Sequence, residues 1–296
     1  MEKLFGIDFG TGGCKATLID LEGNILASAF QEYPSIHQKP GWSEQDPALW
    51  LEAFVQTVRA CREQMPDGFD GVLGMAASAS AHNMVMLDDQ GEVIRPCIMW
   101  NDQRSGDQCR RLQQDHGQRI FDIAMAMPTP TWTLPQLMWV KEQEPEHFAR
   151  LHRLMFTKDY VRAWVTGDFC TDVVDAQGSL LFDARRGEWS EELCALIGLP
   201  MSALPEVRRS KEIVGHVRAE AAQRTGLPEG LPVITGCSDT AAEDFSAGAV
   251  RPGQIIVKLA TAGNVNVVAA TGDPDRKTFT YPYSLECLWY TVTATS

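Results

Sequence analysis

Apolar and polar residues alternate at the start of the chain, which is the pattern of strands with one buried face. Three alternating runs span 4–9, 15–21 and 25–33, and they are separated by the glycine-rich segment 10–13 and the turn 21–24. Connections this short join antiparallel neighbours. The sequence therefore predicts that the chain opens with an antiparallel meander.

A helical period begins at residue 46. Asp46 and Pro47 have the order of an N-cap and a first helical residue, and Trp50, Phe54 and Val58 follow at spacings of four. This pattern predicts an amphipathic helix that packs against the sheet.

Strand and helix patterns then alternate along the rest of the chain. Strands are predicted at 72–77, 84–87, 93–100, 212–217, 231–235, 254–259 and 264–268. Helices are predicted at 103–115, 134–143, 159–165, 190–197, 218–225 and 240–249. This alternation is typical of an α/β protein, and a second unit is expected to begin near Pro252 and Gly253.

Composition narrows the class of partner. The 296 residues carry a formal net charge of -13, which argues against nucleic-acid binding because such proteins collect Lys and Arg on one face. The eight cysteines are scattered without a Cys-x-x-Cys pair, so we expect the reduced thiols of a cytoplasmic protein. The amino terminus has no signal segment, and no apolar run reaches the roughly 18 residues that a membrane span needs. We therefore expect small-molecule partners, no nucleic acid and no membrane, with homodimer formation left open.

The first candidate site is Asp8 with the turn formed by Gly10, Thr11, Gly12 and Gly13. Glycines allow backbone N–H groups to approach phosphate oxygens, Thr11 adds a hydroxyl donor, and Asp8 could hold Mg²⁺ through water. The alternative is an ordinary hairpin turn.

The second candidate is Asp239, which lies between a predicted strand and a predicted helix. Ligand sites of α/β proteins gather at the carboxyl ends of strands, and a carboxylate there could accept a proton from a substrate hydroxyl. Alternatively Ser238, Asp239 or Thr240 only caps the helix, with Glu243 completing a capping box.

A third group contains His82 and the segment Trp100, Asn101, Asp102 and Arg104, all near predicted strand ends. An indole can pack on the apolar face of a sugar while the polar side chains bond its hydroxyls. The alternatives are a structural histidine and a core tryptophan.

A second hydroxyl and glycine turn follows a later strand, with Thr261 and Gly263 in it. Two such turns facing each other could hold the two ends of a triphosphate. The alternative is again a routine hairpin.

Five blocks occur in an order that resembles the FGGY carbohydrate kinases. The blocks are Asp-x-Gly-Thr-x-Gly-x-Lys-Ala at 8–16, Pro-Gly-Trp-Ser-Glu-Gln-Asp-Pro at 40–47, Trp-Asn-Asp-Gln-Arg at 100–104, Thr-Asp-Val-Val-Asp-Ala at 171–176 with Leu-Leu-Phe-Asp at 180–183, and Gly-Cys-Ser-Asp at 236–239. The second block looks like the pentulose and gluconate branches of the family, so the resemblance is xylulokinase-like.

The resemblance implies an α/β fold of the ribonuclease H-like type of the actin/hexokinase superfamily, with a mixed sheet. It implies a sugar-binding amino-terminal domain at 1–250 and the first strands of an ATP-binding carboxy-terminal domain at 251–296. The implied reaction is ATP-dependent phosphorylation of a hydroxyl of a ketopentose such as xylulose, or of a related polyol or sugar acid.

The same resemblance assigns roles to the candidate residues. Asp239 would be the general base, Asp8 would lie by Mg²⁺, and the two glycine turns would contact the phosphates of ATP. His82 and the segment 100–104 would face the sugar.

Two departures from the family pattern concern substrate and phosphate contacts. Ser80 and Ala81 stand where Gln-Met is usual, which predicts a wider pocket, and Ala260-Thr-Ala-Gly263 replaces Gly-Thr-Ser-Gly, which removes one hydroxyl. Members of the family also continue well past this length, so we expect this chain to bind sugar and hardly to phosphorylate it. The alternative is a truncated, non-catalytic carbohydrate-binding module of kinase ancestry.

Overall fold

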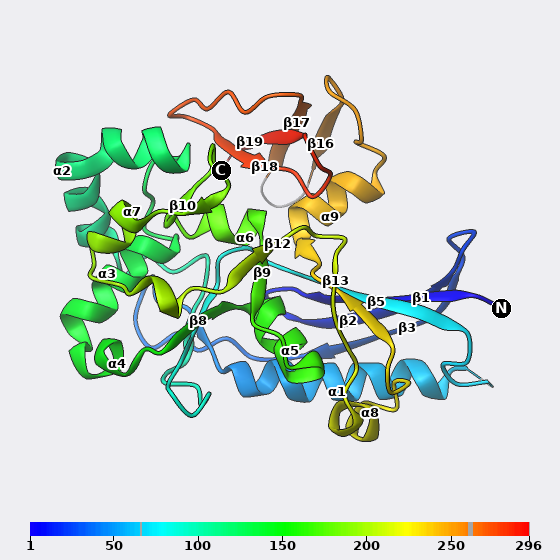
Figure 1. The fold of residues 1–296 in the computed structure, drawn as a ribbon. Helices are drawn as coiled ribbons and strands as arrows, with labels where there is room; N and C mark the ends of the chain where they lie inside the picture. The colour runs from blue at the N-terminus through cyan, green and yellow to red at the C-terminus, as the bar shows by residue number, and fades with distance from the viewer. Residues whose placement is uncertain (66, 260–262, 296) are drawn as a thin grey trace.

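The computed structural model describes residues 1–65, 67–259 and 263–295. At its centre, within these residues, is a seven-stranded sheet in the order β13–β14–β5–β1–β2–β3, with β15 also paired to β5 (Figure 1). Its strands are β1 (Lys3–Phe9), β2 (Gly13–Asp20), β3 (Ile25–Glu32), β5 (Val72–Ala79), β13 (Ile213–His216), β14 (Pro232–Ile234) and β15 (Cys237–Ser238). β1 pairs antiparallel with β2 and parallel with β5. The predicted opening meander and the predicted α/β class with a mixed sheet are both confirmed.

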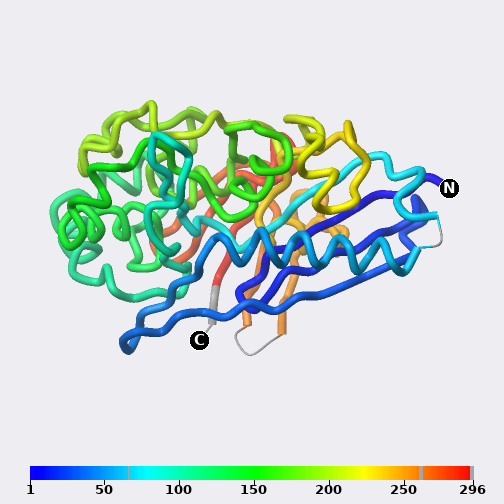
Figure 2. The backbone as a smooth tube through the Cα atoms, turned by 90° about the horizontal axis from the view of Figure 1, so that it is seen from below, coloured from blue at the N-terminus to red at the C-terminus, as the bar shows by residue number. Residues whose placement is uncertain are grey.

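One face of the central sheet is covered by helices. Helix α1 runs along the strands below the sheet, with two further helices beside it (Figures 1 and 2). These helices are α1 (Pro47–Glu63), α5 (Thr157–Thr166) and α8 (Ala219–Thr225). Asp46 caps α1 as predicted, because its side chain accepts a hydrogen bond from Ala48 N at 2.9 Å. Trp50 and Phe54 of α1 are buried in the same core cluster as the inward face of β1.

A second sheet and its helices form the side of the molecule away from the amino terminus (Figure 1). The sheet has the order β4–β7–β6–β8. Its strands are β4 (Glu44–Gln45), β6 (Met84–Leu87), β7 (Cys97–Ile98) and β8 (Arg153–Phe156). The helices of this part are α2 (Gly106–Ala124), α3 (Thr133–Gln143), α4 (Pro145–Arg150), α6 (Val173–Gly178), α7 (Glu191–Ala195) and the 3₁₀ turn η1 (Met201–Ala203). Short strand pairs join β9 (Cys170–Asp172) to β12 (Glu206–Arg208) and β10 (Phe182–Asp183) to β11 (Glu188–Trp189).

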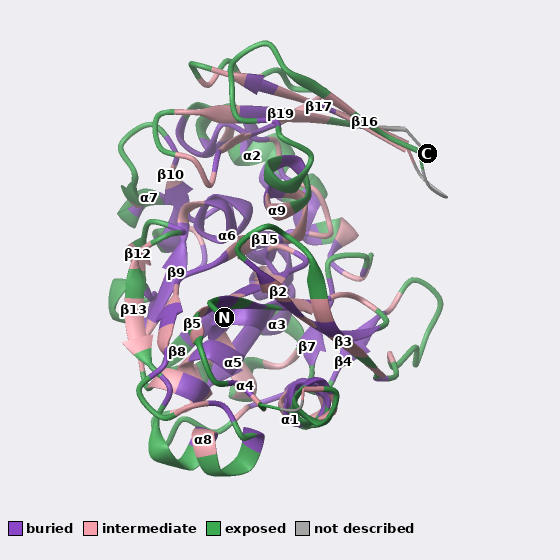
Figure 3. Cartoon of the chain, turned by 90° about the vertical axis from the view of Figure 1, so that its right-hand side faces the viewer, coloured by how far each residue is buried: buried purple, intermediate pink, exposed green. Residues whose placement is uncertain are grey.

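The last part of the chain is an antiparallel sheet in the order β16–β17–β19–β18. Its strands are β16 (Ile255–Lys258), β17 (Gly263–Ala269), β18 (Phe279–Pro282) and β19 (Trp289–Thr295). This sheet lies over α9 (Asp239–Ser246), on the side of the central sheet opposite α1 (Figures 1 and 3). The sheet follows Pro252 and Gly253, where a second unit was expected to begin. Its membership of an ATP-binding domain stays a prediction.

Some predicted boundaries are wrong for reasons of tertiary contact. The strand predicted at 93–100 is reduced to β7, because Pro96 has no N–H group and Trp100 N bonds instead to the Asn83 side chain at 2.6 Å. The helix predicted at 103–115 begins only at Gly106, since Gln103 N is held by Gly41 O at 2.8 Å. Several elements were not predicted; they are α4, α6, η1, β4, β8, β9, β10, β11, β12, β15, β18 and β19.

No helix in the described ranges is both long enough and apolar enough to cross a membrane.

Candidate functional site

A cavity of about 450 Å³ lies between the first part of the chain and the β16–β19 sheet. This volume is in the range of small-ligand sites, roughly 300–1,000 Å³. The lining residues are Ser80, Ala81, His82, Trp100, Ser238, Asp239, Thr240, Lys258, Asn264, Phe279, Tyr281, Tyr290 and Val292. The structure therefore brings together three predicted site residues, His82, Trp100 and Asp239, from segments far apart in sequence.

Asp239 is placed at the cavity by an unusual approach of two strands. Gly236 has a φ of +80°, and a Cβ atom there would lie 2.0 Å from the Ala77 carbonyl oxygen, so only glycine fits. This close approach lets Cys237 and Ser238 pair in parallel with the end of β5. Helix α9 then starts at Asp239, just beyond the edge of the central sheet.

The capping role at this helix belongs to Ser238 rather than to Asp239. Ser238 Oγ accepts a hydrogen bond from Ala241 N at 3.3 Å, and Asp239 is the first residue of α9. Burial raises the pKa of Asp239 to about 6, although a hydrogen bond from Thr240 N at 2.6 Å opposes the shift. The negative charges of Asp8 and Glu243 add to the increase. Asp239 is thus a carboxylate of raised basicity that faces the cavity.

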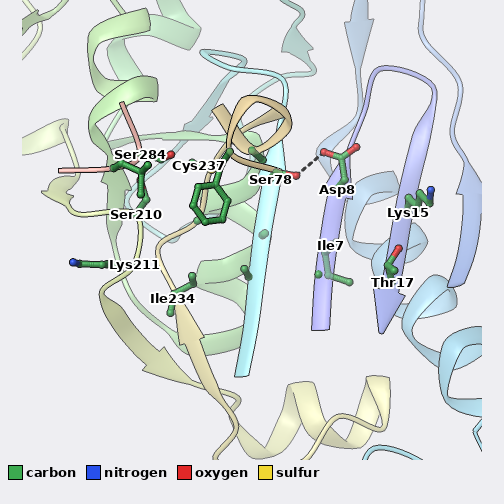
Figure 4. Close-up of a pocket in the computed structure, with 17 residues that line it drawn as sticks. Ile7, Asp8, Lys15, Thr17, Ser78, Ser210, Lys211, Ile234, Cys237 and Ser284 are labelled. Carbon is green, nitrogen blue, oxygen red and sulfur yellow. Dashed lines mark hydrogen bonds between the residues drawn. The ribbon is translucent and has the colours of Figure 1, made fainter. Parts of the chain in front are cut away.

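Asp8 lies on the neighbouring strand β1, level with Ser78 of β5. Ser78 Oγ donates a hydrogen bond to Asp8 Oδ1 at 2.7 Å (Figure 4). Burial raises the pKa of Asp8 above its ordinary value, and Glu243 contributes to the same shift. The charge of Asp8 helps to raise the pKa of Asp239, but the two residues line different cavities.

The space at Asp8 is a second cavity, of about 480 Å³, on the face of the central sheet opposite α1. Asp8, Lys15 and Thr17 line one side of it, and Cys237 of β15 lines the other (Figure 4). Apart from Asp8, no predicted site residue in the described ranges lines this cavity.

The glycine turn between β1 and β2 is held mainly by backbone contacts. Gly10 N donates to Gly13 O at 3.0 Å, and Tyr33 Oη donates to Gly10 O at 2.6 Å. A Cβ atom at Gly13 would lie 2.5 Å from the ring of Phe30, so close packing explains this glycine. A Cβ atom at Gly12 would meet nothing within 4 Å in the described structure, so packing does not explain that one.

Trp100 connects this turn to the first cavity. Its Nε1 donates a hydrogen bond to Thr11 Oγ1 at 3.0 Å, and 43% of the residue surface is exposed. Trp100 is therefore not a core residue, and the turn contacts a residue that lines the cavity. The next residue, Asn101, is exposed and does not line the cavity.

His82 forms part of the cavity wall with little access to solvent. Its exposed fraction is 8%, and its ring packs against Trp132 with centroids 5.3 Å apart. Burial lowers the pKa of His82 to about 4, so the imidazole is neutral at pH 7. Among the described residues, its Nδ1 has no hydrogen-bond partner. A neutral ring nitrogen in this position can accept or donate one hydrogen bond to a ligand.

Asp102 and Arg104 lie in a buried ion-pair network and do not line the cavity. Arg104 Nη2 lies 2.8 Å from Asp102 Oδ2, and Arg104 Nη1 lies 2.7 Å from Glu44 Oε1. The guanidinium also lies 3.8 Å from the ring centroid of Trp42. Asp102 Oδ2 accepts a further hydrogen bond from Ser43 N at 2.6 Å. These contacts fix the segment that follows Trp100, and neither side chain lines the cavity.

The second glycine turn is only partly described. Thr261 lies outside the described residues, and Gly263 begins β17, where it pairs with Thr295. Lys258, the last residue of β16, lines the first cavity and forms an ion pair with Glu243 at 2.5 Å.

The sequence analysis missed the aromatic wall of the cavity. Phe279, Tyr281 and Tyr290 come from β18 and β19, and the rings of Tyr281 and Tyr290 stack with centroids 5.2 Å apart. Phe279 and Tyr281 are two residues apart, so the period of a strand could have placed both on one face. Nothing in the local sequence indicates which residues that face would meet.

Comparison with known proteins gives a consistent family. Residues 4–246 match the family described as "FGGY family of carbohydrate kinases, N-terminal domain". The xylulose kinase of Bacillus subtilis is 35% identical over 267 residues, which are 89% of this chain and 53% of the relative. The chain thus spans about half the length of the curated relatives it matches.

Solved structures agree with this similarity. A protein from Brucella ovis described as a xyloylose kinase has a TM-score of 0.95 and 33% identity, over 99% of this chain and 60% of its own. The xylulose kinase of Rhodospirillum rubrum has a TM-score of 0.96 and 28% identity, over 100% of this chain and 61% of its own. The fold expected from the resemblance is therefore confirmed.

Proposed function

The chain belongs to the FGGY family of carbohydrate kinases, and from this premise we propose that the protein phosphorylates a sugar hydroxyl with ATP. The relatives named as xylulose kinases favour a ketopentose such as xylulose as the acceptor, with a related polyol or sugar acid as the wider class. The observation that carries the proposal is the cavity in which Asp239, His82 and Trp100 meet.

Asp239 is the general base in this proposal. Ser238 caps α9, so the Asp239 carboxylate is available to a ligand in the cavity. A pKa of about 6 leaves Asp239 mostly ionised at pH 7 while making it a stronger base than an ordinary aspartate. A base near the working pH contributes about 10²–10⁴ to the rate of proton transfer. Asp239 would take the proton of the sugar hydroxyl as that oxygen attacks the γ-phosphorus.

The sugar would lie between a polar and an aromatic side of the cavity. His82 offers a neutral ring nitrogen, and Ser80 is a further polar group in the lining. Trp100 and the rings of β18 and β19 supply apolar surface for the C–H faces of a sugar. Ala81, with its short side chain, leaves room where a larger residue would narrow the cavity. Asp102 and Arg104 would act by fixing the segment that follows Trp100 rather than by touching the sugar.

The phosphate side is proposed at the glycine turn. Thr11 contacts Trp100 of the cavity wall, so we place the γ-phosphate beside this turn, where it would meet the sugar. Thr261 and Gly263 are proposed to contact the other end of the triphosphate.

Asp8 is the residue that we propose as a ligand of Mg²⁺. No cluster of three or more Asp, Glu, His or Cys that could hold a metal occurs within the described ranges. Magnesium usually takes one or two carboxylates together with phosphate oxygens and water, which a single Asp8 can satisfy. The raised pKa of the Asp8 carboxyl is that of a group whose charged form gains from a nearby cation. When bound there, Mg²⁺ would neutralise charge on the phosphates.

Calorimetry with D-xylulose, gluconate and glycerol, followed by a coupled assay for ATP consumption, tests the function. We expect D-xylulose to bind, and its Kd to rise in His82→Ala, which removes a polar partner worth roughly 1–3 kcal/mol. In a version extended to the length of the relatives, Asp239→Asn is expected to keep sugar affinity and to lower turnover by at least about 10². Sugar binding without any turnover in the native protein would favour the carbohydrate-binding module, and failure of all three compounds to bind would refute the site.

A further inference from the structure

A cluster of charged groups that the proposed reaction does not use lies buried behind the cavity. Lys158 Nζ lies 2.9 Å from Asp159 Oδ1, 2.7 Å from Asp172 Oδ1 and 2.5 Å from Asp175 Oδ2. At most 2% of any of these side chains is exposed. Apolar residues of similar volume often stabilise a fold as well as a buried ion pair does, so stability alone is a weak explanation for such a cluster.

One acid of this cluster also touches the cavity wall. Asp175 Oδ1 accepts a hydrogen bond from His82 N at 2.7 Å, while its Oδ2 is held by Lys158. Asp175 lies on α6, Lys158 lies on α5, and His82 lies in the connection between β5 and β6. The carboxylate therefore ties the backbone of a cavity residue to two helices.

The backbone of His82 needs such support. Its φ of 51° is in the left-handed region, which a residue with a side chain adopts only when its surroundings hold it there. Thr133 Oγ1 donates a second hydrogen bond, to the His82 carbonyl, at 3.0 Å. Gly178, on the same helix as Asp175, leaves room for the ring, because a Cβ atom there would lie 3.0 Å from His82 Cδ2. These contacts fix one orientation of the imidazole in the cavity wall.

We propose that Asp175, held in place by Lys158, is a positioning residue that fixes the His82 imidazole for sugar binding. The inference rests on the proposed function, since it assigns a support to the His82 contact with the sugar. Asp175 does not touch the sugar and acts only through His82.

Asp175→Asn is the sharpest test, because asparagine has the same size as aspartate. The amide oxygen can accept from His82 N or from Lys158 Nζ, but the amide nitrogen then faces the other donor. One of the two contacts is lost, and His82 is no longer fixed. Calorimetry is expected to show about a ten-fold rise in the Kd for D-xylulose, the usual effect of one misplaced hydrogen bond.

Asp168→Asn is the matched control. Asp168 lies 3.0 Å from Arg162, which is on α5 like Lys158, and it does not line the cavity, so the substitution removes a half-buried acid partner of α5 away from the site. The Kd for D-xylulose of Asp168→Asn is expected to stay within about two-fold of the parent value, while thermal melting shows a loss of stability like that of Asp175→Asn. Equal effects of the two variants on the Kd would overturn the proposal.

A double variant and an NMR titration separate positioning from general damage. Asp175→Asn added to His82→Ala is expected to leave the Kd where His82→Ala alone puts it, because both act through one side chain. The His82 ring in Asp175→Asn is also expected to titrate closer to the ordinary pKa of histidine, since a released ring is better solvated. Additive effects on the Kd, or an unmoved His82 titration, would contradict the positioning role.

Thr133→Val tests the same role in case Asp175→Asn does not fold. Thr133→Val removes the hydrogen bond to the His82 carbonyl without changing charge or size, and it is expected to raise the Kd in the same direction. An unchanged Kd in Thr133→Val would show that sugar binding does not depend on fixing the His82 backbone. If His82→Ala itself leaves the Kd unchanged, the proposed sugar site fails rather than the role of Asp175.

Discussion

Asp239→Asn is expected to make the protein more stable while removing its base. Burial raises the pKa of Asp239 to about 6, against about 3.9 for an unfolded aspartate, so the folded state penalises the ionised carboxyl. Asparagine is neutral at every pH and keeps an oxygen that can accept the hydrogen bond from Thr240 N. The substitution therefore removes the penalty and leaves the helix start intact.

The size and sign of this effect follow from the two pKa values. One pKa unit corresponds to about 1.4 kcal/mol, so the penalty is about 3 kcal/mol at most, and solvent in the cavity reduces it to about 1–3 kcal/mol. Because the folded-state pKa is the higher one, the folded state binds more protons, and the parent loses stability as pH rises from about 4 to about 6. Asp239→Asn should match the parent below pH of about 4 and exceed it by a constant amount above about 6.

Urea unfolding of both chains at pH 4, 5, 6 and 8 measures this difference. Asp20→Asn is a control of opposite sign, because the Asn24 side chain and nearby backbone N–H groups lower the pKa of Asp20. That variant should be less stable than the parent at pH 8, and the gap should shrink as pH falls. If Asp239→Asn is no more stable than the parent at pH 8, or if its advantage is the same at pH 4, the pKa argument for the base is wrong.

Two further predictions concern the structure around the site. Gly236→Ala should lower the free energy of unfolding by about 3 kcal/mol or more, because the new Cβ would collide with the Ala77 carbonyl. Gly91 is the control: it has a similar φ of +81°, but a Cβ there would meet nothing within 4 Å in the described structure. Gly91→Ala should therefore lower the free energy of unfolding by only about 1 kcal/mol. Equal losses in urea unfolding would show that backbone strain, not the collision, makes glycine necessary at 236. Arg104→Met should destabilise by about 3–5 kcal/mol, since it leaves Asp102 buried without its cation and leaves Glu44 with Arg95 alone. Arg110→Met breaks only an exposed pair with Asp107 and should leave the melting temperature unchanged. A normal melting temperature for Arg104→Met together with weakened sugar binding would indicate that Arg104 contacts the sugar.

Strands and helices with a clear hydrophobic period were predictable, because that period only requires one face of the element to be buried. The alternation in β1 to β3 follows from one buried sheet face, and the cap of α1 at Asp46 follows from local hydrogen bonding. The strand at 93–100 failed because the partners of Trp100 N and Gln103 N come from distant segments. Helix α6 was missed because its six residues are almost entirely buried and show no polar face.

The sequence by itself determined the chemistry of the candidate groups and their family. Asp8, Asp239 and His82 stand out because a glycine turn, a strand end and a polar residue in apolar surroundings are local features. Alone, however, each of these features had a structural explanation of similar weight.

Only the tertiary structure decided between those explanations, because the competing roles differ in distant contacts and not in local sequence. Ser238 takes the cap and leaves Asp239 facing the cavity, whereas Asp102 is closed inside an ion-pair network. The aromatic wall of the cavity comes from β18 and β19, about 200 residues after His82, and the support of His82 comes from Asp175 on α6. Burial and charge neighbours, which set the pKa of Asp239, exist only once these segments meet.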